Sequence, residues 1–153
     1  MRPISLAAVI ALSTAVTPAR AHAQAPARST VAPQGMSVTA TLSPGFRIGD
    51  MVYVSGQLPS KPGSREPLDS TIQGQTRQAL ENVKAVVEAS GTTMASVVKC
   101  TVFLTDVKDF AGMNSVYSTY WPKDPPARST VAVAALVRPD AKIEVECIAA
   151  IPK

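Results

Sequence analysis

The chain has 153 residues, which suits a single domain. Its formal net charge of +4 falls to +2 without the first 23 residues, because that segment contains Arg2 and Arg20. A charge this small excludes electrostatically driven binding of nucleic acid. The only histidine, His22, lies in the same segment. The remaining chain therefore cannot use Ser-His-Asp or Cys-His catalysis, and a catalytic zinc site is not expected.

The first 23 residues are typical of a secretory signal peptide. An apolar run covers residues 4–16, and a small-x-small triplet ends at Ala23. We expect cleavage after Ala23, with Ala25 as the alternative end of the triplet. An uncleaved anchor is disfavoured, because 13 apolar residues are too few for a comfortable membrane span. The sequence thus predicts an exported protein, periplasmic or secreted, that has no membrane attachment after cleavage.

The segment that follows is predicted to be a flexible lead-in over residues 24–37, because it is rich in Ala, Pro, Ser and Gln. It contains the heptapeptide PARSTVA at residues 26–32, which recurs at residues 126–132. The flanks of the two copies differ, so we interpret the first copy as a coincidence and place no site there. The folded domain is then expected to cover residues 38–153.

Alternating and helical patterns of apolar residues divide this domain into eight elements. Ser70 and Gln73 fit a capping box at the start of the first helix, and Gly91 is placed to end it. Asp106 begins the second helix, which stops at Trp121. The predicted strands cover residues 38–42, 46–48, 51–55, 97–104, 129–136 and 142–151, and the predicted helices cover residues 70–90 and 106–120.

The resulting order, β-β-β-α-β-α-β-β, predicts an α+β domain with one mixed sheet of about six strands. Each helix has a single apolar stripe, so both helices are expected on the same face of the sheet. The far face would then carry Lys99, Thr101, Phe103, Glu144 and Glu146. This face is mixed in polarity, and self-association is a natural way to cover it.

Arg128 and Glu144 are the best candidates for chemistry. Arg128 stands at the mouth of a predicted strand, and a guanidinium can bind a carboxylate through two N–H groups. Glu144 follows 16 residues later on the last strand, where a carboxylate can hold or activate a water molecule. Taken singly, Arg128 fits a solvated or salt-bridged loop arginine equally well. Glu144 alone fits a solvent-facing residue or a partner of Lys99.

The two cysteines, Cys100 and Cys147, each lie on the apolar phase of a predicted strand. We interpret them as two buried small side chains. In an exported chain they can also oxidise, but a disulfide requires adjacent strands in register.

Several strings along the chain resemble the reactive-intermediate deaminase superfamily of the RidA/YjgF type. They occur in the family's order over roughly residues 50–150, and the ordered set is far more specific than any one string. The strings are VYVSGQ at residues 52–57, QTRQALENVK at 75–84, VVKCTVFLTD at 97–106, FAGMNSVY at 110–117, PARS at 126–129 and IEVE at 143–146.

This resemblance implies a YjgF/chorismate-mutase-like fold and a homotrimer with clefts between subunits. The implied activity is hydrolysis of short-lived enamines and imines, such as 2-aminoacrylate, to 2-oxo acids and ammonia, with no metal or organic cofactor. Carried over by position, Arg128 would bind the substrate carboxylate and Glu144 would activate water. Substrate-binding roles fall to four further residues, which are Ser55, Gly56, Asn114 and Thr130.

The chain departs from the family in one segment. Many active members carry a Gly-Pro-Tyr segment whose tyrosine faces the ligand, whereas residues 37–45 here contain no tyrosine. This departure motivates an alternative function, a trimeric protein that binds a small carboxylate without turnover. Ribonuclease activity, a label that the family sometimes carries, is disfavoured by the low charge and the missing histidine.

Overall fold

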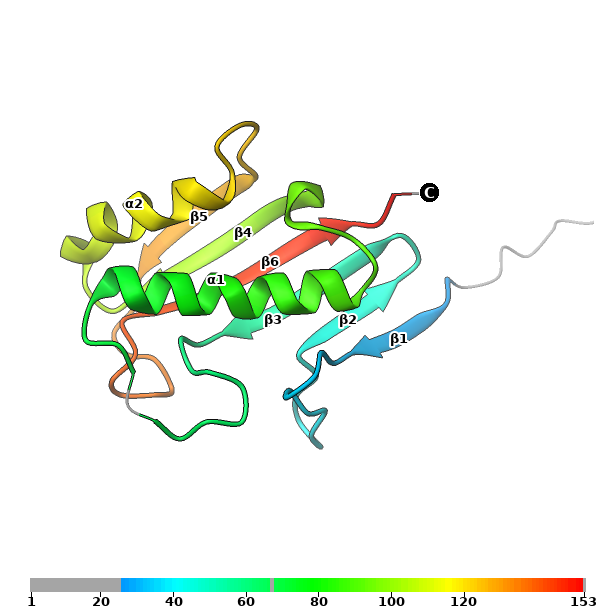
Figure 1. Cartoon of the computed structure of the whole chain (residues 1–153), viewed down its shortest axis with the longest axis horizontal. Helices are drawn as coiled ribbons and strands as arrows, with labels where there is room; N and C mark the ends of the chain where they lie inside the picture. The colour runs from blue at the N-terminus through cyan, green and yellow to red at the C-terminus, as the bar shows by residue number, and fades with distance from the viewer. Residues whose placement is uncertain (1–25, 67, 153) are drawn as a thin grey trace, which may run out of the picture.

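Six strands form one mixed sheet in the computed structural model, which describes residues 26–66 and 68–152 (Figure 1). The strand order across the sheet is β1-β2-β3-β6-β4-β5, and only the β4–β5 pair is parallel. The strands are β1 (Arg28–Val31), β2 (Gly45–Ile48), β3 (Met51–Gln57), β4 (Val97–Leu104), β5 (Ala127–Ala132) and β6 (Ile143–Ala150). The predicted signal peptide, residues 1–23, lies outside the described residues.

Both α-helices cover the same face of this sheet, and the other face is left open (Figure 1). They are α1 (Ile72–Ala89) and α2 (Phe110–Tyr120), each near a short 3-10 helix, η1 (Met94–Ser96) or η2 (Val107–Asp109). The predicted α+β class, single sheet and element order are therefore confirmed. None of the helices in residues 26–66 and 68–152 is long and apolar enough to cross a membrane.

The core lies between the sheet and the helices, as the sequence periodicity predicts. From Cys100 onward in β4, and along all of β6, every second side chain is buried, which is the pattern of a sheet covered on one face. The stripe of α1 packs on these side chains. Its fully buried members are Ala79, Leu80, Val83, Val86 and Val87.

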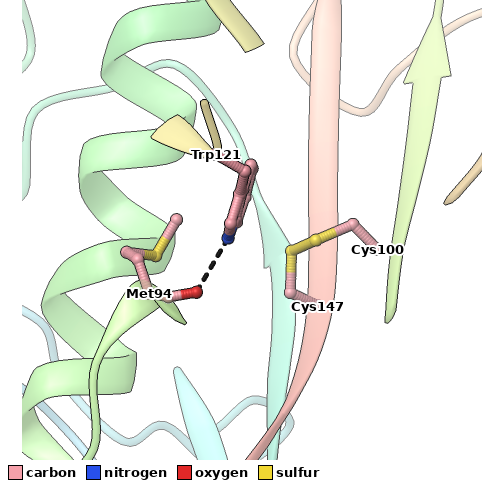
Figure 2. The surroundings of a disulfide bond; sticks show 4 residues. All are labelled: Met94, Cys100, Trp121 and Cys147. Carbon is pink, nitrogen blue, oxygen red and sulfur yellow. Dashed lines mark hydrogen bonds between the residues drawn. A yellow bond between two sulfur atoms is a disulfide. The ribbon is translucent and has the colours of Figure 1, made fainter. Parts of the chain in front are cut away.

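A disulfide links Cys100 of β4 to Cys147 of β6 inside this core (Figure 2). The two residues are direct cross-strand partners, with Cα atoms 4.1 Å apart. Both side chains are buried, as expected, but the interpretation as two unpaired thiols is wrong. The antiparallel β4–β6 register brings the two sulfur atoms together, and a single sequence does not reveal register.

The first strand is not where the sequence pattern placed it. β1 lies inside the predicted lead-in, whereas residues 38–42 form no strand. The flexible character expected for residues 28–31 is therefore wrong, and the sheet begins well before residue 38. An edge strand needs one partner only, and β1 finds it in β2, where the Val31 side chain joins the core. The alternation of apolar and polar residues over 38–42 predicted a strand, but no strand forms there.

The two PARSTVA copies form the two edge strands of the sheet and turn opposite faces to the core. In β1, Val31 is buried and Arg28 lies on the open face, with its Cζ atom 5.1 Å from the centre of the Phe46 ring. In β5 the arrangement is reversed. Val131 lies on the open face and is 45% exposed, whereas the Arg128 side chain lies on the face that the helices cover. The same sequence thus pairs antiparallel at one edge and parallel at the other.

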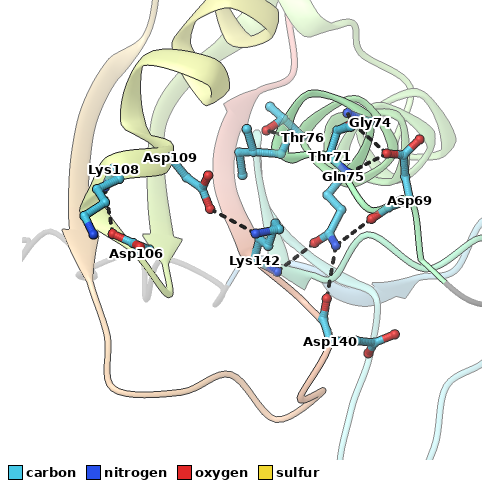
Figure 3. Close-up of polar contacts among 11 residues, drawn as sticks. Asp69, Thr71, Gly74, Gln75, Thr76, Asp106, Lys108, Asp109, Asp140 and Lys142 are labelled. Carbon is cyan, nitrogen blue, oxygen red and sulfur yellow. Dashed lines mark hydrogen bonds and ion pairs between the residues drawn. The ribbon is translucent and has the colours of Figure 1, made fainter.

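Buried Gln75 ties the start of α1 to the segment that leads into β6 (Figure 3). Its Nε2 atom donates to the carbonyl oxygens of Asp69 and Asp140, at 2.8 and 3.0 Å. Its Oε1 atom accepts from the backbone N–H of Lys142 at 2.7 Å. The cap of α1 is Thr71, one residue after the predicted Ser70, and its side chain accepts from the Gly74 N–H. These contacts fix the chain just before Glu144.

Candidate functional site

Arg128 is the second residue of β5, so it lies within the strand rather than at its mouth. Its half-buried side chain turns toward α2, where the guanidinium stacks on the ring of Tyr117 with Cζ 4.4 Å from the ring centre. A second ring, that of Phe110, lies 5.8 Å away. No carboxylate within residues 26–66 and 68–152 forms an ion pair with Arg128. A guanidinium without an acidic partner can bind an external carboxylate.

A cavity of about 610 Å³ opens beside this guanidinium, between α2 and the segment that leads into β5. Asn114 lines it from α2, and Pro126 lines it from the segment before Arg128. Thr130 lies two residues beyond Arg128 on the same side of β5, and its buried hydroxyl has no hydrogen-bond partner among the described residues. Three of the predicted site residues, Arg128, Asn114 and Thr130, are therefore grouped along the edge formed by α2 and β5.

Glu144 lies on the opposite, open face of the sheet. Its neighbours Ile143 and Val145 point into the core, and its cross-strand partner on β4 is Phe103. Partial burial, and secondarily the charge of Glu146, raises the pKa of the Glu144 carboxyl above its ordinary value. A carboxylate whose pKa is raised in this way is a better proton acceptor at neutral pH than an exposed one.

Gly56 makes room for the Glu144 side chain. A Cβ atom at Gly56 would overlap the Oε1 atom of Glu144, so any larger residue there would require this carboxylate to move. The adjacent Ser55 is held in place, because its hydroxyl donates to the Ser43 carbonyl oxygen at 2.6 Å. Its backbone N–H donates to the carbonyl oxygen of Pro44 at 3.0 Å. Ser55, Gly56 and Glu144 therefore form a second group, at the junction of β3 and β6.

The structure thus divides the six predicted site residues into two groups of three. Within one chain Arg128 and Glu144 do not meet, because their side chains leave opposite faces of the sheet. Arg128 is level with the buried Cys100 of β4, whereas Glu144 is level with Phe103 on the open face. Any reaction that uses both side chains therefore requires more than one copy of the chain.

Tyr117 also belongs to the site, although it is not among the predicted site residues. It is 4% exposed and therefore in the core, yet its ring contacts Arg128. Burial raises its pKa to about 12, with Arg128 opposing part of the shift. The available sequence signal was the spacing of Phe110 and Tyr117, seven residues and two turns apart on one helix face. Nothing in the sequence placed that face against β5.

No group of three or more His, Cys, Asp and Glu side chains is arranged to hold a metal ion in the described part of the chain. The side chains available for chemistry at the two groups are therefore a guanidinium, a carboxylate, hydroxyls and an amide. This set can bind a carboxylate and can accept a proton from water.

Known proteins resemble this chain over most of its length. The profile of the family described as Endoribonuclease L-PSP matches residues 32–151. A RutC family protein of Saccharolobus solfataricus is 47% identical over 107 residues, which are 70% of this chain and 84% of the relative. The Escherichia coli K12 protein named "Putative reactive intermediate deaminase TdcF" is 44% identical over 108 residues, or 69% of this chain and 82% of that protein.

Two solved structures from E. coli have the same fold. TdcF with bound serine superposes with a TM-score of 0.73 at 37% identity, covering 81% of this chain and 99% of TdcF. The YjgF gene product superposes with a TM-score of 0.72 at 40% identity, covering 80% of this chain and 98% of that protein.

Proposed function

We propose that this chain, which belongs to the Endoribonuclease L-PSP family, hydrolyses reactive imines and enamines of amino acids to 2-oxo acids and ammonia. The observation that carries the proposal is the Arg128 guanidinium, which faces a cavity without an acidic partner. The 44% identity with a protein named as a reactive intermediate deaminase supports the same activity. A substrate such as 2-aminoacrylate supplies the carboxylate that Arg128 would bind.

The reaction needs one water molecule and proton transfers only. The enamine first takes a proton from the solvent at its terminal carbon and becomes an iminium ion. Glu144 then accepts a proton from water as the oxygen forms a bond to the iminium carbon. Glu144 returns this proton to the nitrogen of the resulting carbinolamine, the C–N bond breaks to release ammonia, and the hydroxyl proton returns to the solvent as the 2-oxo acid forms. No electron is gained or lost, so the residues of the two groups suffice for this chemistry.

We further propose that the active form is a homotrimer in which Arg128, Asn114 and Thr130 of one copy face Ser55, Gly56 and Glu144 of the next. This arrangement is supported by the placement of the two groups on opposite faces of one chain. The exposure of Tyr53 and Val131 on the open face, at 46% and 45%, agrees with an interface there. Sedimentation velocity should give three times the mass of one chain, and a monomer with full activity would exclude the shared site.

Ammonia release provides the test of activity. Imines are generated in the assay by an L-amino-acid oxidase, and the rate of 2-oxo acid formation is compared with and without the protein. Arg128→Ala should remove the acceleration, and Arg128→Lys should reduce kcat/KM roughly 10- to 100-fold, because hydrogen bonds to charged groups contribute about 1.5–3 kcal/mol. Arg28→Ala is the matched control, because Arg28 lies in the same heptapeptide at the other edge. An equal loss in both alanine variants would argue against a site at Arg128.

The second candidate function is binding of a small carboxylate without turnover. It is favoured by the absence of a tyrosine from residues 37–45. The solved structure of TdcF contains bound serine, which is itself a small carboxylate. A thermal shift with pyruvate that Arg128→Ala abolishes, together with no acceleration of imine hydrolysis, would support this function. Endoribonuclease activity, which the family description names, is not proposed, because the charge of residues 24–153 is only +2 and they contain no histidine.

We also propose that the protein is exported after cleavage behind Ala23. The apolar segment at residues 4–16 supports export, and the Cys100–Cys147 disulfide is typical of an oxidising compartment. N-terminal sequencing of protein from the periplasmic fraction of an expressing bacterium should begin at Gln24. An intact Met1 in the soluble fraction would contradict export.

A further inference from the structure

Aromatic rings, rather than an acidic side chain, hold the guanidinium of Arg128. The Tyr117 ring lies under it, the Phe110 ring lies at a greater distance, and Nη1 is 3.9 Å from the Sδ atom of Met113. A ring face attracts a cation without occupying its N–H groups. Apart from the weak hydrogen bond that Nη1 donates to the Met113 sulfur, no hydrogen bond within the described residues occupies the N–H groups of Arg128, so they remain available to a ligand.

A second ring fixes Tyr117 in turn. The centre of the Trp121 ring lies 4.8 Å from that of Tyr117, and Trp121 is 6% exposed. Its Nε1 atom donates to the carbonyl oxygen of Met94 at 2.7 Å, as Figure 2 shows. The ring of Tyr117 thus contacts both Trp121 and Arg128, and Trp121 is anchored to the main chain of η1.

The hydroxyl group of Tyr117 makes no hydrogen bond within the described residues that would explain why a tyrosine occupies this position. Its Oη atom is buried and has no hydrogen-bond partner among the described residues. An unpaired buried hydroxyl is destabilising, so packing alone would favour phenylalanine. The ring of Tyr117 contacts both Trp121 and Arg128, and it is the contact with Arg128 in which a ring face attracts a charged group.

We propose that Tyr117 is a positioning residue whose ring holds the Arg128 guanidinium in the orientation that receives the ligand carboxylate. The proposal rests on the proposed function, since it requires that Arg128 bind a carboxylate. A free arginine side chain loses rotamer freedom when it binds, and a stacked one has already lost it. The ring therefore improves carboxylate affinity through its contact with Arg128.

Calorimetric titration of the full protein with pyruvate, and with its neutral amide as the comparison ligand, tests the proposal. Tyr117→Leu should weaken pyruvate binding about tenfold, which is about 1.4 kcal/mol and lies within the range of partly desolvated cation–π contacts. Binding of the amide should be unchanged, because the amide offers no carboxylate. Tyr117→Phe keeps the ring and should retain wild-type affinity. Tyr120→Leu is the matched control, because Tyr120 also packs near Trp121 but makes no contact with Arg128.

The outcomes separate this proposal from the proposed function. If Arg128→Ala binds pyruvate as well as wild type does, the carboxylate site itself is wrong. If Arg128→Ala loses binding while Tyr117→Leu keeps it, only the positioning role is overturned. Equal losses for pyruvate and the amide in Tyr117→Leu would show general damage and would also overturn it. Should Tyr117→Leu fail to fold, Tyr117→Met removes the ring but keeps an apolar side chain that adapts to the core, and an unchanged preference for pyruvate there would overturn ring positioning.

Discussion

Reduction of the Cys100–Cys147 disulfide should destabilise the folded protein by about 4 kcal/mol. The bond joins residues with a sequence separation of 47. For a loop of that length the lost entropy of the unfolded chain corresponds to about 4 kcal/mol at 25 °C. Reduction leaves every side chain in place, so the change reports on the crosslink and not on a cavity. Domains of this kind have about 5–15 kcal/mol of total stability, so the expected loss is a large part of the whole.

Urea unfolding followed through Trp121, the only tryptophan in the chain, measures this loss. The oxidised protein is compared with protein reduced under denaturing conditions and refolded with the reductant present. The Cys100→Ala/Cys147→Ala variant should lose more, because it also removes two buried sulfur atoms. Thiol titration in urea should detect no free thiol before reduction. Equal unfolding free energies in the two redox states, or free thiols in the untreated protein, would refute the reasoning.

Three further changes test the surroundings of the site. Gly56→Ala should displace the Glu144 carboxylate and lower deaminase kcat/KM at unchanged circular dichroism, and wild-type activity would contradict the close packing. Gln75→Ala should lower the urea-measured stability by at least about 2 kcal/mol, because it leaves main-chain groups of Asp140 and Lys142 without partners; a smaller loss would mean that water replaces them. The pKa of Glu144 is raised on folding, so its stabilising contribution is present below its ordinary pKa and is lost as the pH rises through the folded value. Glu144→Gln should therefore be more stable than wild type at pH 7 but not at pH 3, and a pH-independent difference in urea unfolding would argue against the shift.

The sequence predicted the elements whose signal is local. The alternation in β4 and β6 and the apolar stripe of α1 each follow from the burial of one face, and a single element carries the whole pattern. The strings that carry the family resemblance lie largely in β3, α1, β4, α2, β5 and β6, and the match of the family profile to residues 32–151 confirms it. Prediction was weakest at the edges of the sheet, where a short strand has one partner and buries little.

Features that depend on register could not be predicted. The bond between Cys100 and Cys147 follows from the alignment of β4 with β6, and the separation of Arg128 from Glu144 follows from which face each strand turns to the core. The two PARSTVA copies show the limit clearly. Both form strands, although only the second copy was predicted to do so, and the neighbours of each copy decide whether its arginine or its valine faces the core.

The disulfide lies in the cross-strand row that begins at Arg128 and continues through Cys100 to Cys147. It therefore fixes the register of β4 against β6 covalently, in addition to linking the two strands. A slip of β6 against β4 by two residues would preserve the alternation of faces but would move Glu144 by roughly 7 Å along the sheet. The disulfide prevents this slip in the folded chain. The offset between β4 and the glutamate strand β6 is then fixed by a bond, and the arginine strand β5 pairs directly with β4.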